Sequence, residues 1–140
     1  MIYVLDCNVA LKWFLPEPLS DEANRLLARF RAGTDALLAP DLLLAEFGYT
    51  LRKRCDGHTL TSVEVREIWE DFLALGLETV PISTLVKDAM GIALTHMGNF
   101  YDAVYVALAR DRGCSVVTAD DRMGRAFGIL GCITRLGALS

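Results

Sequence analysis

IYVLDCN, residues 2–8, places a short continuous apolar run directly before an acid and a polar turn. Such a run, apolar on both faces, is typical of a buried strand in a parallel sheet. Asp6 stands at its end, where a carboxylate beside hydrophobic residues is costly unless something pairs with it. The segment therefore predicts a first parallel strand and marks Asp6 as a candidate functional residue.

Similar short apolar runs recur along the chain with helical patterns between them. Further strands are predicted at 36–39, 77–80, 115–118 and within 129–136. The predicted helices cover 9–14, 21–31, 42–54, 62–75, 83–97, 103–109 and 121–127. Strands that alternate with helices indicate a parallel sheet covered on both faces. We expect an α/β fold, a three-layer α/β/α sandwich around a central, mostly parallel sheet of about five strands, in a single domain 1–140.

Local signals support several of the helix ends. Ser20 is a candidate N-cap for the helix at 21–31, and Thr61 with Glu64 forms a capping-box pattern before the helix at 62–75. The segment 103–109, AVYVALA, is apolar all round, which predicts a helix in the centre of the protein.

The composition limits the protein class. Hydrophobic residues make up 53% of the 140, but no stretch approaches the twenty uninterrupted apolar residues needed to cross a bilayer. The N-terminus has no basic region before its apolar run, so it does not resemble a signal peptide. We expect a cytoplasmic protein with no membrane association. Its four cysteines are widely and irregularly spaced and form no CxxC pair, which argues against a zinc site.

Three further acidic residues stand beside apolar segments, as Asp6 does. They are Glu46 in PDLLLAEF, Asp102 in FYDAVYVALA and Asp120 in VVTADDR. Ligands of parallel sheets gather where the strands end, so Asp6 and Asp120 would face one crevice if their strands are neighbours. The formal net charge of −4 equals the charge of these four acids, so it does not exclude a nucleic-acid partner.

Each acid also has a structural interpretation. Asp6, Asp102 and Asp120 could be helix N-caps, a common role for Asp between a strand and a helix. Helix capping does not explain Glu46, which lies inside a predicted helix. Its neighbours there are mostly apolar, so the helix has little polar face on which Glu46 could be solvated. Asp121 is interpreted as a rim residue or a cap beside Asp120.

Asn8 and Thr118 are candidate supporting residues. Asn8 follows Asp6 by two positions and Thr118 precedes Asp120 by two, so both could hydrogen-bond neighbouring carboxylates. Such donors commonly orient the ligands of a metal, although both residues also suit ordinary turns and caps.

Four clustered carboxylates without histidine or cysteine favour Mg²⁺ or Mn²⁺. Phosphodiester hydrolysis is the reaction that such a site performs most naturally. No serine or cysteine nucleophile with a histidine partner is evident, and neither GxGxxG nor a P-loop occurs. Lys12 and Arg122 are the cations predicted to lie near the crevice and to contact RNA.

The segments LDCNVALKWF, PDLLLAEFGYTL, FYDAVYVALA and VVTADDRM resemble the four acidic motifs of PIN-domain ribonucleases, in particular VapC-type toxins of bacterial toxin–antitoxin pairs. The resemblance spans nearly the whole chain. It implies that the metal-binding and catalytic acids are Asp6, Glu46, Asp102 and Asp120, with Asp6 and Asp102 the most dependable ligands. The spacing from Thr118 selects Asp120 over Asp121.

The resemblance also implies an RNA substrate, a homodimer and a cognate antitoxin whose tail covers the acidic crevice. Trp13, Phe14, Trp69 and Phe72 could line a groove for that partner, or could pack in the core. Two other functions stay open at this point. One is a catalytically silent PIN-like binding or assembly module. The other is a phosphatase with Asp6 as nucleophile, although such enzymes generally have a second Asp where this chain has Asn8.

Overall fold

The computed structural model describes residues 1–139 and contains one five-stranded, fully parallel sheet. Its strands are β1 (Ile2–Leu5), β2 (Ala36–Pro40), β3 (Glu78–Val80), β4 (Ser115–Thr118) and β5 (Ile133–Arg135), in the order β3-β2-β1-β4-β5. The predicted α/β architecture is confirmed. Because β1 pairs with both β2 and β4, the chain reverses its winding direction between β1 and β4. This reversal is where parallel sheets form their ligand crevices.

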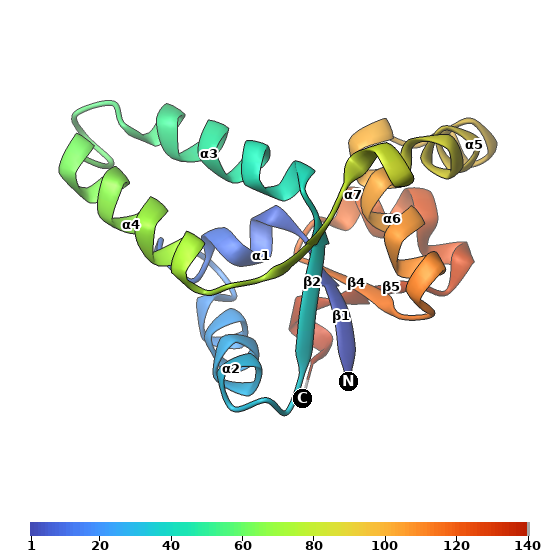
Figure 1. Ribbon diagram of the computed structural model, residues 1–140, viewed down its shortest axis with the longest axis horizontal. Helices are drawn as coiled ribbons and strands as arrows, with labels where there is room; N and C mark the ends of the chain where they lie inside the picture. Colours follow the sequence, from blue (N-terminus) through green and yellow to red (C-terminus); the bar gives the residue numbers. More distant parts are fainter. Residues whose placement is uncertain (140) are drawn as a thin grey trace.

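Helices cover both faces of the sheet and give the predicted three layers (Figure 1). The layer on the left of Figure 1 holds α1 (Cys7–Leu11), α2 (Ser20–Arg31), α3 (Leu42–Arg54) and α4 (Ser62–Ala74). The layer on the right holds α5 (Val86–His96), α6 (Phe100–Arg112) and α7 (Asp121–Phe127). Short 3₁₀ turns at Ile82–Thr84, Gly128–Leu130 and Leu136–Ala138 complete the described elements. No helix within residues 1–139 is both long and apolar enough to span a membrane.

The helix ends follow the sequence signals with three corrections. The capping box of α4 forms as predicted, because the Thr61 hydroxyl accepts from the Glu64 amide and the Glu64 carboxylate accepts from the Thr61 amide. Ser20 is not an N-cap; it is the first residue of α2, and its hydroxyl accepts from the Glu17 amide. The first helix begins at Cys7 and ends at Leu11, earlier than the predicted 9–14, because Asp6 already caps it. In α6 the capping residue is Asn99, not Asp102.

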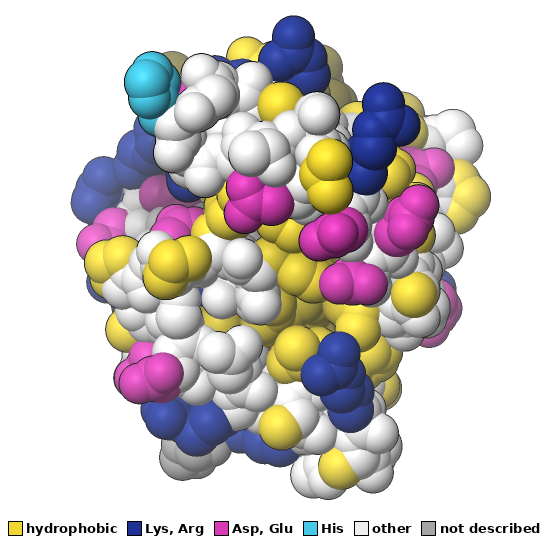
Figure 2. Space-filling view, turned by 90° about the vertical axis from the view of Figure 1, so that its left-hand side faces the viewer, with side chains coloured by type: hydrophobic (Ala, Val, Ile, Leu, Met, Phe, Trp, Pro, Cys, Tyr) yellow, Lys and Arg dark blue, Asp and Glu magenta, His cyan; other side chains and the backbone are white. Residues whose placement is uncertain are grey.

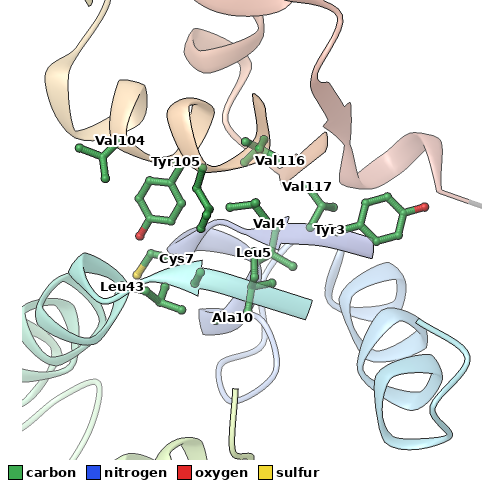
Figure 3. Packing of buried hydrophobic residues seen from close by; sticks show 14 of the residues in the cluster. Tyr3, Val4, Leu5, Cys7, Ala10, Leu43, Val104, Tyr105, Val116 and Val117 are labelled. Carbon is green, nitrogen blue, oxygen red and sulfur yellow. The ribbon is translucent and has the colours of Figure 1, made fainter. Parts of the chain in front are cut away.

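Helix α6 is the central helix of the protein, as its apolar sequence predicts. Every residue from Ala103 to Ala109 is buried, and α6 packs on β1, β2 and β4. Figure 3 shows the Tyr105 ring extending from α6 towards Cys7 and Leu43, across the ends of the central strands. The helix thus fixes its own N-terminal turn, with Asp102, against the carboxyl edge of the sheet.

An aromatic cluster joins α3 and α4 on the opposite layer. Phe47 stacks on Phe72 with ring centroids 3.9 Å apart, and Trp69 and Phe14 contact the same pair. Phe72 is almost fully buried, and the Trp13 indole donates to the Ala23 carbonyl. These contacts show that the four aromatic residues considered for a partner groove pack mainly within the protein. They anchor α3, and with it Glu46.

Candidate active site

The four acids line one cleft of about 550 Å³ at the carboxyl edge of the sheet. Asp6 follows β1, Glu46 lies on α3, Asp102 lies in the first turn of α6, and Asp120 precedes α7. Because β1 and β4 are neighbours, the chain reversal brings Asp6 and Asp120 to one edge. The convergence expected from the sequence is present, and four separate segments build it.

Asp6 lies at the bottom of the cleft and is held by a dense set of donors. Its side chain, only 7% exposed, accepts hydrogen bonds from the Cys7 amide (2.8 Å), Asn8 Nδ2 (3.1 Å) and the Thr118 hydroxyl (2.7 Å). One residue thus caps α1 and presents a carboxylate to the cleft. The capping and functional interpretations of Asp6 do not exclude each other.

Asn8 and Thr118 tie the two central strand ends together. The Asn8 amide oxygen accepts from the Ala119 amide at 3.0 Å, and the Thr118 hydroxyl accepts from the Asp120 amide at 2.9 Å. Each side chain therefore contacts Asp6 on one side and the segment leading to Asp120 on the other. This bridge fixes the relative positions of the two acids.

Burial and mutual repulsion make two of these carboxyls unusually basic. The pKa of Asp6 rises to about 7, chiefly because burial disfavours its charge, with further increases from Asp102 and Glu46. The pKa of Asp102 rises to about 6, again chiefly through burial, with contributions from Asp120 and Glu46. The acids are therefore close enough for each charge to penalise the next.

Glu46 has a specific buried partner. The hydroxyl of Tyr105, a side chain only 1% exposed, donates to Glu46 Oε1 at 2.5 Å. The pKa of Glu46 is raised by partial burial, and the bond from Tyr105 opposes that rise. Sequence reasoning treated Tyr105 only as core. The available signal was its spacing, because Tyr105 lies three residues after Asp102 and so shares a helix face with it.

Asp120 and Asp121 have different roles. Asp120 lines the cleft, caps α7 through the Arg122 amide at 2.9 Å and contacts the Arg122 guanidinium at 3.3 Å. Asp121 is exposed and bonds Arg135 at 2.6 Å, which places it on the outer surface. The geometry agrees with the choice of Asp120 that the Thr118 spacing made.

The two cationic residues predicted to contact RNA, Arg122 and Lys12, also lie in different places. Arg122 lines the cleft and has an exposed side chain. Lys12 does not line it; its side chain is 10% exposed and pairs with Glu17 at 3.7 Å. Lys12 lies away from the cleft because α1 ends at Leu11 and the following turn carries it towards the loop that contains Glu17; its contact with RNA stays a prediction.

The side chains of the cleft suit a hard divalent cation. Within residues 1–139, no group of three or more His, Cys, Asp or Glu side chains is drawn closely enough together to hold a metal ion by itself. Mg²⁺ usually keeps several waters and binds through one or two carboxylates, so a looser arrangement suits it. No side chain of the described residues donates a hydrogen bond to the Asp102 carboxylate, which leaves its oxygens open to the cleft. A cation would also relieve the repulsion that raises the pKa values of Asp6 and Asp102.

Comparison with known families identifies this architecture. The family model described as "PIN domain" matches residues 3–127, which include all four acids. The chain belongs to the PIN domain family. Divalent metal dependence is general in this family, in agreement with the all-carboxylate cleft.

Individual relatives agree with the family assignment. The chain is 31% identical over 134 residues to Ribonuclease VapC3 of Pyrobaculum aerophilum, covering 93% of this chain and 98% of that protein. Among solved structures, it resembles VapBC2 of Rickettsia felis bound to a promoter DNA fragment (TM-score 0.70, 20% identity, 96% of this chain and 98% of that one). It also resembles FitAcB of Neisseria gonorrhoeae (TM-score 0.69, 18% identity, 99% and 100% covered). At these identities the structural matches show the fold alone.

Proposed function

We propose that this PIN-domain protein is a Mg²⁺- or Mn²⁺-dependent endoribonuclease that hydrolyses RNA phosphodiester bonds and acts as the toxin of a toxin–antitoxin pair. The observation that carries the proposal is the convergence of Asp6, Glu46, Asp102 and Asp120 in one cleft. The full-length similarity to a protein named Ribonuclease VapC3 supports RNA as the substrate.

The position of each side chain in the cleft indicates its proposed role. Asp6 and Asp102 are the proposed principal ligands, because both carboxyls have raised pKa values that a cation would offset. Glu46 and Asp120 are the other two acids of the cleft. Tyr105 orients Glu46 through a hydrogen bond, and Asn8 and Thr118 orient the segment that leads to Asp120. When bound, the cation would supply an activated water nucleophile and stabilise the negative charge that develops on the leaving oxygen.

The test is RNA cleavage by the purified protein with Mg²⁺ or Mn²⁺. We expect Asp6→Asn and Asp102→Asn to abolish cleavage and growth inhibition while circular dichroism shows an intact fold. Asp121→Asn is the matched control, since Asp121 faces outward and should be dispensable. Cleavage that survives both Asp6→Asn and Asp102→Asn would refute the proposal. A protein that binds a partner but neither binds Mn²⁺ nor cuts RNA would instead be a silent binding module.

The antitoxin partner is proposed from the structural neighbours, which include a toxin–antitoxin complex from Klebsiella pneumoniae (TM-score 0.69, 14% identity, 96% of this chain and 97% of that one). Figure 2 shows the side of the molecule formed by α2, α3 and α4, where apolar side chains line a hollow with several acidic side chains beside it. One hollow on this side, of about 490 Å³, is lined by apolar side chains that include Phe14, Leu60 and Ile68, and by two acids and one cation, Glu64, Glu67 and Arg54. An antitoxin segment with an apolar face and basic flanks would fit this surface.

Two measurements test the cellular part of the proposal. Growth inhibition on expression should disappear when a short neighbouring antitoxin gene is expressed together with this chain. Ile68→Glu should weaken that rescue without changing RNA cleavage, because Ile68 lies in the hollow and outside the acidic cleft. We further propose a cytoplasmic homodimer, and a monomeric mass in analytical ultracentrifugation would refute the dimer.

A further inference from the structure

The acidic cleft lacks the cations that usually hold a nucleic acid. Asp6, Glu46, Asp102 and Asp120 line it, and within the described residues Arg122 is its one Lys or Arg. Arg122 is itself paired with Asp120 at 3.3 Å. Lys and Arg contacts to phosphate supply most of the affinity in ordinary nucleic-acid binding. Contacts other than those to Arg122 must therefore supply much of the affinity of this cleft for a strand.

Two exposed tyrosines stand at the walls of the same cleft. Tyr49 of α3 is 67% exposed and Tyr101 of α6 is 56% exposed, and both line the cleft. Tyr49 lies three residues after Glu46 on one helix face, and Tyr101 immediately precedes Asp102. Each ring therefore stands beside one of the acids and belongs to a different helix.

Neighbouring side chains support both rings. Lys53, one turn further along α3, places its ammonium over one face of the Tyr49 ring, 5.4 Å from the centroid, which leaves the opposite face for a base. The Tyr101 ring packs edge-to-face against Phe100, with centroids 6.3 Å apart. Supported rings lose less conformational freedom when a ligand stacks on them, which favours binding.

The turn between α5 and α6 adds an apolar contact to the same wall. Met97 lines the cleft with its side chain 90% exposed, and its backbone adopts the left-handed conformation (φ 54°). A residue other than glycine in this conformation carries a local free-energy cost. Met97 thereby exposes an apolar side chain at the same cleft that Tyr101 lines, where a ligand would cover it.

We propose that Tyr49 and Tyr101 are the base-stacking residues of this cleft, each holding an unpaired base of the RNA beside one of the acids. The inference rests on the proposed ribonuclease function and specifies its substrate. Aromatic side chains bind nucleic-acid bases through their flat faces, which a duplex hides between its own stacked bases. The stacking also tolerates different base identities, so the rings select unpaired structure before sequence.

Binding is measured in the Asp102→Asn background, so that RNA cleavage does not interfere. The probes are a short fluorescein-labelled single-stranded RNA and the same sequence annealed to its complement, followed by anisotropy in Mg²⁺. We expect Tyr49→Ala and Tyr101→Ala each to weaken single-strand binding by about tenfold. Tyr→Phe at either position should bind within about twofold of the parent because the stacking face is kept. Ile129→Ala, an 86% exposed apolar control outside the cleft, should change nothing.

Equal binding by the alanine variants, or a preference for the duplex, would overturn the base-stacking proposal. Alanine variants that keep RNA affinity but lose the antitoxin would also overturn it and make the rim a protein contact. The proposed RNA cleavage can be refuted independently of the base-stacking proposal. If the wild-type protein with Mg²⁺ or Mn²⁺ cuts no RNA while the binding pattern is as expected, the subsites stand and the ribonuclease function falls.

Discussion

The Tyr105 hydroxyl donates a hydrogen bond to Glu46 across the interface between α6 and α3, at a distance of 2.5 Å. Glu46 is the acid that helix capping never explained, and this bond accounts for its orientation. Tyr105 also shares a helix face with Asp102, so a single helix presents one acid and positions another. The pKa of the Tyr105 hydroxyl is raised by burial and by the charges of Glu46 and Asp6, which keeps its proton on the donor.

Tyr105→Phe should weaken Mn²⁺ binding by roughly tenfold, because partners that orient a ligand typically contribute that much to metal affinity. The ring remains, so the core stays filled. Mn²⁺ affinity is measured by isothermal titration calorimetry. Tyr3→Phe serves as the control, since Tyr3 is buried in β1 and does not line the cleft. Unchanged affinity in Tyr105→Phe would show that Glu46 needs no help from this hydroxyl.

The metal-free protein should lose stability as the pH rises from about 4 to 7. The pKa of Asp6 lies at 3.8 in the unfolded chain and at about 7 in the fold, so the folded protein binds more protons within this window. Stability is therefore greatest at the acidic end and falls across this window, in which Asp6 is ionised in the unfolded chain but still protonated in the fold. The contribution of Asp6 to this fall is at most about 4 kcal/mol at ~1.4 kcal/mol per pKa unit. Urea unfolding in EDTA at pH 4.0 and 7.5 measures the difference.

Two comparisons check this interpretation. Asp6→Asn should reduce the pH dependence, because the amide does not titrate, and leave the part that comes from the raised pKa of Asp102. Saturating Mn²⁺ should raise the melting temperature most at pH 7.5, where the carboxylates are ionised and repel one another. A melting temperature that does not change in millimolar Mn²⁺ would contradict the role of the cleft as a cation site.

The sequence predicts the sheet because its strands are short buried runs that need no distant information. It predicts Asp6 and Asp120 for the same reason, since residues that end neighbouring parallel strands must meet at one edge. It does not show that Lys12 lies outside the lining of the cleft, because the direction of that side chain depends on where α1 ends and on a loop partner, Glu17. Tyr105 was missed because its spacing from Asp102 indicates only a shared helix face, and nothing in the apolar helix shows that the buried hydroxyl faces Glu46.

Gly98→Ala should destabilise the wall of the cleft. An added Cβ at Gly98 would lie 2.1 Å from Phe127 Cζ, and Phe127 is fully buried. Either the turn between α5 and α6 or α7 must shift, at a cost of about 1–3 kcal/mol. Gly91→Ala is the matched control, because nothing lies within 4 Å of the added carbon and alanine favours an exposed helix interior by up to ~1 kcal/mol. Urea unfolding should therefore move in opposite directions for the two variants, and a stable Gly98→Ala would contradict the packing.

Thr118→Val tests the role of the Thr118 hydroxyl separately from the space that the side chain fills. That hydroxyl donates to Asp6 at 2.7 Å and accepts from the Asp120 amide at 2.9 Å, so valine fills the space but breaks both contacts. Leaving the buried Asp6 carboxyl without this donor costs about 1–3 kcal/mol and raises its pKa further, because the Thr118 bond lowers that pKa. We expect a lower melting temperature in EDTA and a pH dependence displaced upwards. Thr118→Ser, which keeps the hydroxyl, should restore the pH dependence even where the lost methyl group lowers the melting temperature. Equal pH profiles for the valine and serine variants would show that Thr118 acts through packing alone.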